Sequence, residues 1–153
     1  RYTNRERTKE IEEFFATRLR EYEKALDVRA DQHRKISIRA PKLARGSEGP
    51  RGLLAFYFAF LATENKYGSS AFCPIVVDAP NQQGQDVGHL KAMMRFMLKN
   101  KPDGAQLIVA AETTPIDADV DVQDISSRKD AVLRQDQYDD VSSYLRPYLN
   151  RLV

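Results

Sequence analysis

The sequence predicts an α/β fold in which a parallel sheet is flanked by helices. Two short apolar runs, residues 72–78 and 106–111, have the β-branched composition of strands covered on both faces. Between them, residues 86–98 space their apolar side chains as a helix does. The order strand, helix, strand predicts a right-handed crossover between parallel neighbours, which is the building unit of an α/β sheet.

Composition sets limits on the kind of protein. The chain has 153 residues, 42% hydrophobic and 30% charged, as expected of one globular domain. Its 24 Lys and Arg against 22 Asp and Glu leave a net charge of +2, which provides no dominant field for a polyanion. The longest apolar run, residues 53–62, is too short to span a bilayer. A single cysteine, Cys73, excludes an internal disulfide framework.

The beginning of the chain carries two further expectations. No secretory signal is visible there, so we expect a reducing, cytoplasmic setting. The first residue is Arg1 within a helical pattern, which indicates a segment of a longer product.

The first predicted element is an amphipathic helix over residues 5–26. Its apolar side chains recur at steps of three and four residues, and charged side chains occupy the other faces. This apolar stripe consists of Ile11, Phe14, Phe15, Leu19, Tyr22 and Leu26. It suits either a helix packed on its own core or the stump of a longer coiled coil. Residues 35–40 then alternate Ile36 and Ile38 with polar neighbours, which predicts a half-buried strand.

The middle of the chain alternates polar loops with apolar elements. A glycine-bearing loop, residues 45–52, leads into a buried helix that begins at Leu53. The strand over residues 72–78 follows, with Cys73 as a core thiol. Asp86 is placed to cap the next helix, and residues 101–104 form a turn. In the tail, residues 119–125 and 131–133 suggest short strands, and residues 138–152 a closing helix.

Asp78 is the most informative candidate for chemistry. It ends a predicted parallel strand, and open α/β sheets bind ligands beyond the carboxyl ends of their strands. A carboxylate at such a position suits Mg²⁺, a hard cation that prefers oxygen ligands and retains water. The plainer alternative is that Asp78 only caps the turn that follows.

Two motifs around this strand carry a resemblance to a known family. Residues 75–83, Ile-Val-Val-Asp-Ala-Pro-Asn-Gln-Gln, resemble the Walker B strand and D-loop of ABC-type ATPases of the SMC/Rad50 kind, whose strand ends in Asp-Glu-Pro. Residues 46–51, Gly-Ser-Glu-Gly-Pro-Arg, resemble a degenerate form of the family's signature loop, Leu-Ser-Gly-Gly-Glu, which also runs into an apolar helix. The order and spacing of the motifs fit over residues 35–112.

The resemblance implies a fold, a domain division and site residues. The chain would be the C-terminal half of a P-loop ABC-type nucleotide-binding head, with residues 1–30 as the helical stump of a coiled-coil arm and residues 31–153 as the C-terminal ATPase lobe. Asp78 would hold Mg²⁺, and Asp86 would belong to the D-loop. Ser47 and the backbone around Gly49 would contact the γ-phosphate of ATP bound to the opposite subunit. Alternatively, the glycines only shape a helix-entry turn.

The sequence departs from the family at its catalytic positions. Ala79 stands where the family has its catalytic Glu, and the family's switch His has no counterpart at residues 111–113. Gln82 or Gln83 would then orient the attacking water, as a Gln does in small GTPases, or would instead form a polar subunit contact. Glu112, after the second strand, is the other candidate for the base.

No Lys in the chain is followed by Ser or Thr, so the chain lacks a Walker A loop. The resemblance therefore implies three partners: an N-terminal lobe that carries Walker A, a second ATPase head, and DNA; no membrane partner is expected. The implied function is ATP binding and hydrolysis between engaged heads, coupled to DNA transactions. One alternative is a catalytically deficient dimerisation or adaptor module on the same scaffold. Another is an unrelated magnesium-dependent phosphotransfer domain that uses Asp78.

Overall fold

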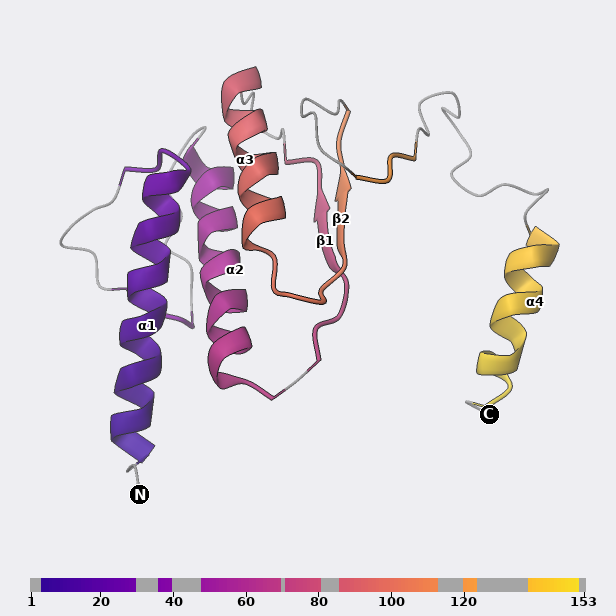
Figure 1. Cartoon of the computed structure of the whole chain (residues 1–153), viewed down its shortest axis with the longest axis horizontal. Coiled ribbons are helices and arrows are strands. Elements are labelled where there is room, and N and C mark those ends of the chain that lie inside the picture. Colours follow the sequence, from indigo (N-terminus) through magenta and orange to yellow (C-terminus); the bar gives the residue numbers. More distant parts are fainter. Residues whose placement is uncertain are drawn as a thin grey trace. The chain divides into compact units, whose positions relative to one another are not determined.

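The structure is a computed structural model that describes residues 4–29, 36–39, 48–69, 71–80, 86–112, 120–123 and 138–151. Its elements are, in order, α1 (Asn4–Ala25), α2 (Glu48–Tyr67), β1 (Ile75–Asp78), α3 (Val87–Asn100), β2 (Leu107–Ala110) and α4 (Tyr138–Leu149) (Figure 1). The chain divides into two compact units, Arg1–Asp117 and Ala118–Val153, which are described separately below.

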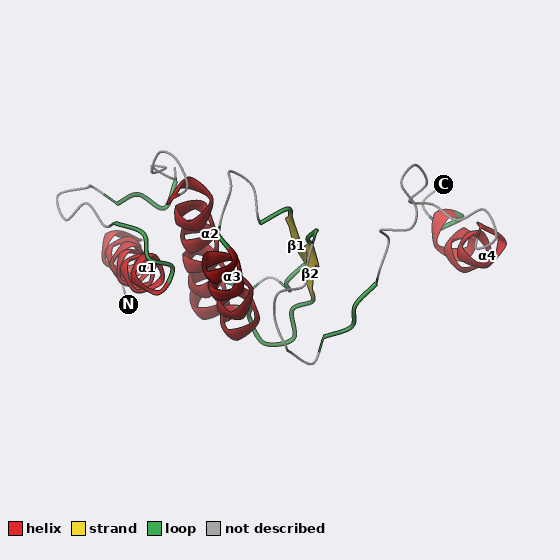
Figure 2. Ribbon diagram, turned by 90° about the horizontal axis from the view of Figure 1, so that it is seen from above, coloured by secondary structure: helices red, strands yellow, loops and turns green. Residues whose placement is uncertain are grey.

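The first unit is layered, with α2 and α3 between α1 and the sheet (Figure 2). The predicted first helix is confirmed as α1, and it packs along α2 through buried side chains that include Phe15 and Leu19. The rings of Phe15 and Phe56 meet edge to face with centroids 5.3 Å apart. This arrangement suits the quadrupoles of two buried aromatic rings.

The core of the first unit continues from α2 into α3. Phe58 of α2 is 1% exposed, and its ring lies 5.3 Å from that of Phe96 on α3. Met93 and Met97 on the same face of α3 are also buried, and flexible methionine side chains fill the irregular space between the helices. The predicted helix after Asp86 is therefore confirmed, with its apolar stripe in the core.

The sheet consists of β1 and β2 among the described residues. The strands are parallel, with Ile75 beside Leu107 and Asp78 beside Ala110, which confirms the predicted parallel pairing through α3. One face packs on the helices through Val77, Leu107 and Val109. The prediction of strands covered on both faces is wrong for the described chain, because Val76 on the other face is 65% exposed.

The start of α2 differs from the sequence prediction. Glu48, Gly49 and Pro50 were expected in a loop but form the first turn of the helix. Glycine and proline are typical of loops, yet the first four N–H groups of a helix have no intrahelical acceptor, so proline loses no hydrogen bond there. The apolar helix itself is confirmed.

Two short strand predictions are wrong where the structure describes them. Residues 36–39 contain a turn in place of a strand. The Ser37 hydroxyl accepts a hydrogen bond from the Arg39 N–H at 3.2 Å, a local bond that competes with strand pairing. Residues 120–123 also form no strand, and residues 131–133 lie outside the described part of the chain.

The second unit contains α4, which confirms the predicted closing helix. Pro147 lies inside this helix, and α4 has no buried residue. Its large apolar side chains are exposed, and Val141, Tyr144 and Tyr148 are each more than half exposed. Among the described residues, no helix combines the length and apolar character that crossing a bilayer demands.

Candidate functional site

The carboxyl ends of β1 and β2 bring together two of the predicted site residues. Asp78 is the last residue of β1 and is aligned with Ala110, the last residue of β2. Glu112 follows two residues later, so both carboxylates belong to the same edge of the sheet, and both side chains are exposed. This is the edge at which open α/β sheets bind ligands.

The residue after Asp78 has an unusual backbone. Ala79 adopts a φ of 48°, in the left-handed region, and its N–H donates to the carbonyl oxygen of Ala110 at 2.9 Å. A side chain with Cβ pays about 1–2 kcal/mol for this conformation. Such local strain is concentrated at functional edges and turns. Here it turns the chain out of the sheet immediately after Asp78, at the position where the family resemblance expects a Glu.

The amino end of α2 lies near this edge. Gly49 is in its first turn, and Pro50 lines the same cleft as Asp78. Free N–H groups and the helix dipole at such an end favour an anion. The acidic Glu48 opposes that preference, and it is held by Arg29, whose Nε lies 3.7 Å from its Oε1.

Asp86, predicted in the D-loop, is the N-cap of α3. Its Oδ1 accepts the backbone N–H of His89 at 2.9 Å, and its Oδ2 pairs with Nδ1 of the same residue. The backbone hydrogen bond from His89, followed by the bond from its side chain, lowers the pKa of Asp86. Asp86 therefore has a structural role at the start of α3.

The predicted set also includes Ser47, Gln82 and Gln83, which lie outside the described residues. Within the described ranges, no group of three or more His, Cys, Asp or Glu side chains is arranged around a metal position. Asp78 by itself still suits Mg²⁺, which proteins commonly hold through one or two carboxylates while water and phosphate oxygens complete the shell.

Sequence reasoning missed a polar cluster where α1, α2 and α3 meet. Oδ2 of Asp27 lies 3.4 Å from Nε2 of His89 and 3.7 Å from Nη1 of Arg51. Arg51 is 4% exposed, and Asp27 has a left-handed backbone with a φ of 52°. One feature of the sequence could have indicated this cluster: Arg51 stands at the start of an apolar helix. If a cation in that position does not reach solvent, it must be buried against hydrogen-bond acceptors.

Sequence reasoning also missed a cleft of about 870 Å³ between α2 and residues 71–80. Its walls are mostly apolar and aromatic, and Glu64 and Asp78 are the charged residues that line it. Cys73 lines the cleft and is exposed, so its predicted role as a core thiol is wrong. The cleft was missed because the apolar helix after residue 52 was predicted to be buried all round.

Comparison with known proteins adds no assignment. The chain matches no protein-family model, no curated protein and no solved structure.

Proposed function

We propose that this chain is the C-terminal lobe of an SMC/Rad50-like ATPase head. In this proposal it binds ATP and Mg²⁺ between two engaged heads in the cytoplasm once a Walker A lobe completes the site. The observation that carries the proposal is Asp78 at the carboxyl end of a parallel strand, in a cleft that is also lined by Pro50 in the first turn of α2. A carboxylate and a helix amino end are complementary to a metal–phosphate pair.

In this site, different residues of the chain would bind the metal, bind the nucleotide and activate the attacking water. Asp78 holds Mg²⁺, which supplies charge neutralisation for the phosphates when it is bound. Ser47 and the backbone N–H of Gly49 bind the γ-phosphate of the nucleotide on the opposite head. Glu112 accepts the proton of the attacking water, or Gln82 and Gln83 orient that water. Hydrolysis then separates the heads and is coupled to DNA.

A second candidate function has its own support. Ala79 directly follows Asp78, so the carboxylate that would serve as base in the related ATPases has no equivalent there. This favours a head that engages with ATP and does not turn it over, a catalytically deficient dimerisation or adaptor module. The two candidates share the nucleotide site and differ only in hydrolysis.

Head engagement tests the shared site. The chain, assembled with its Walker A lobe, is expected to dimerise with ATP and Mg²⁺ in light scattering, and Asp78→Asn or Ser47→Arg is expected to abolish this. Asp103→Asn is the matched control, because Asp103 is also exposed but lies in the turn before the amino end of β2. ATP-dependent dimerisation that survives in both Asp78→Asn and Ser47→Arg would refute the proposal.

Turnover separates the two candidates. If Glu112 is the base, Glu112→Gln reduces ATP hydrolysis by about 10²-fold or more, in keeping with the usual contribution of a general base, while ATP-dependent dimerisation is retained. Unchanged turnover removes Glu112 from the mechanism. A wild-type head that dimerises with ATP without detectable hydrolysis supports the adaptor.

A further inference from the structure

The cleft beside β1 leaves large aromatic side chains partly exposed to solvent. On the α2 side it is lined by Tyr57, which is 54% exposed, and Phe60, which is 39% exposed. Residues 71–80 form the opposite side. Large exposed aromatic side chains gathered in one concavity are typical of a surface that another molecule covers. This cleft between α2 and residues 71–80 is called the edge groove below.

The edge groove runs along an unpaired side of β1. The Ile75 N–H donates to the carbonyl oxygen of Gln106, just before β2, at 2.8 Å, and the Ala79 N–H donates to that of Ala110, in β2, at 2.9 Å. Backbone groups alternate in direction along a parallel strand, so the N–H and C=O groups of Val76 and Asp78 face away from β2. Residues of β1 line the groove and those of β2 do not, which places it on this unpaired side. No described residue pairs with that side of β1.

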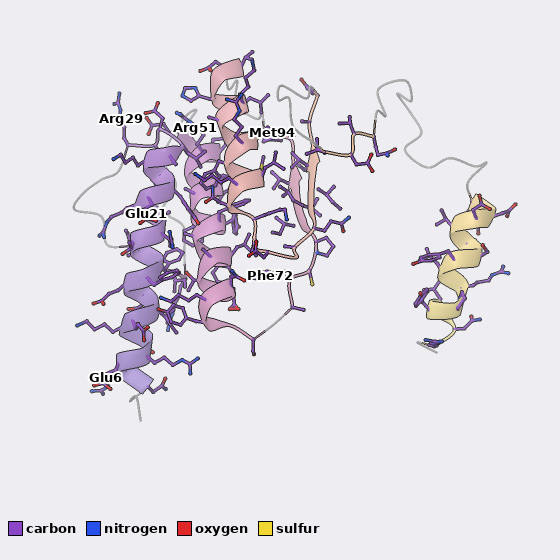
Figure 3. All side chains as sticks on the ribbon, in the orientation of Figure 1. Glu6, Glu21, Arg29, Arg51, Phe72 and Met94 are labelled. Carbon is purple, nitrogen blue, oxygen red and sulfur yellow. The ribbon has the colours of Figure 1, made fainter. Side chains whose placement is uncertain are left out.

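The groove has the length of a short strand. Its α2 wall extends from Pro50 to Glu64, which at 1.5 Å per residue is about 21 Å of helix. A strand of seven residues covers about the same distance at 3.3 Å per residue. Figure 3 shows Arg51, near the start of α2, and Phe72, which precedes β1, toward opposite ends of this stretch.

We propose that the edge groove binds an extended segment of a partner polypeptide, added as a strand to the unpaired side of β1. Strand addition would pair the backbone groups of Val76 and Asp78 and cover the aromatic wall of α2 with alternate apolar side chains. Glu64 and Asp78, from the two sides of an otherwise uncharged groove, favour a segment with basic residues at its ends. A small apolar ligand or a helix would leave the strand edge unpaired.

The first test uses a fluorescent peptide, Lys-Val-Thr-Val-Thr-Val-Lys, and the full chain without nucleotide or divalent cations. We expect saturable binding by anisotropy, at least tenfold weaker when Glu replaces both peptide Lys residues. Two N-methylated peptides are compared, one methylated at the odd-numbered and one at the even-numbered peptide bonds. One of them is expected to bind at least tenfold more weakly than the unmodified peptide, and the other less than threefold more weakly. That two-residue periodicity is specific to strand pairing, because only alternate N–H groups face β1.

The second test locates the peptide on the protein. Tyr57→Lys is expected to weaken binding at least tenfold. Ile108→Lys, an equally drastic change at an exposed residue of β2 that does not line the groove, is expected to leave it unchanged. Saturating peptide is expected to slow amide hydrogen exchange at Val76 and Asp78. It is also expected to slow the reaction of Cys73, which lines the groove, with a thiol reagent at least tenfold.

Three results would overturn the inference. If both N-methylated peptides bound equally well, the groove would be a pocket for apolar ligands and not a site of strand addition. If the protein dimerised as its concentration rose and the Val76 amide was then protected from exchange, the occupant of the groove would be a second copy of this chain. No saturable binding, or binding with no change at Val76 and Cys73, would exclude strand addition here. None of these outcomes bears on ATP, because neither nucleotide nor Mg²⁺ is present.

Discussion

Arg51, in the first turn of α2, donates a hydrogen bond from Nη1 to the carbonyl oxygen of Leu26 across 3.1 Å. This bond joins two helices at the point where α1 has just ended, so it satisfies a carbonyl that has no intrahelical donor. The guanidinium is buried, and its Nε has no hydrogen-bond partner among the described residues. Arg51 therefore ties the end of α1 to the start of α2, although its buried guanidinium is only partly hydrogen-bonded.

Removing this side chain is predicted to destabilise the first unit. Arg51→Ala loses a buried charge-assisted hydrogen bond and leaves the Leu26 carbonyl unpaired, which costs about 2–3 kcal/mol in the free energy of unfolding. Urea denaturation followed by circular dichroism measures this change. Arg29→Ala is the control, because the Arg29 side chain is 94% exposed and its ion pair with Glu48 contributes about 0.5 kcal/mol or less. Equal effects of the two substitutions would contradict the role given to Arg51.

A second prediction concerns the interface between α1 and α2. Phe15 is 1% exposed and meets the ring of Phe56, so Phe15→Ala creates a cavity and is expected to cost about 3–5 kcal/mol. Phe60→Ala removes an equal volume from a side chain that is 39% exposed, and a loss of only about 1–2 kcal/mol is expected. Thermal unfolding of both variants provides the comparison. A small effect at Phe15 would mean that α1 does not belong to the core.

Tyr22 is predicted to make the fold sensitive to alkali. Its ring packs against Phe96 with centroids 5.0 Å apart, and burial raises the pKa of its hydroxyl above the ordinary 10.0. The folded state therefore retains this proton longer than the unfolded state does. The stabilising contribution is complete below pH 10 and is lost as the pH rises through the folded-state value. Tyr22→Phe should abolish that part of the alkaline loss of stability in urea titrations between pH 9 and about pH 11.5. An unchanged alkaline profile would count against this assignment.

The sequence predicted the pairing of β1 and β2 better than their extent. Continuous apolar runs and an intervening amphipathic helix were sufficient to predict parallel neighbours. The predicted strand began at residue 72, but the ladder begins at Ile75, directly after Pro74. Alternation at Ile36 and Ile38 gave a false strand because both side chains pack on the core from a turn. Over so few residues, tertiary packing decides the conformation.

The candidate site was predictable where it depends on strand ends. Asp78 and Glu112 lie at one edge because parallel strands end together, and this follows from order along the chain. The contacts among Asp27, Arg51 and His89 depend on how three helices converge, which no local pattern encodes. The edge groove exists because one side of β1 has no neighbouring strand among the described residues. The sequence of an apolar strand does not show whether it has a neighbour on one side or on both.

Asp86 provides the last prediction, on acid stability. The backbone N–H and side chain of His89 bond its carboxylate and lower its pKa below the ordinary 3.8. A lowered folded-state pKa means that this stabilisation is complete above about pH 4 and is lost as the pH falls through the folded-state value. Asp86→Asn keeps a good N-cap but not the charge, so it should lower stability only slightly at pH 7 and flatten the loss below pH 4. Asp86→Ala removes the cap and should lower stability at both pH values. Urea midpoints measured at pH 7 and pH 3 separate the two variants, and an Asn variant as acid-sensitive as the wild type would show that another carboxylate controls the transition.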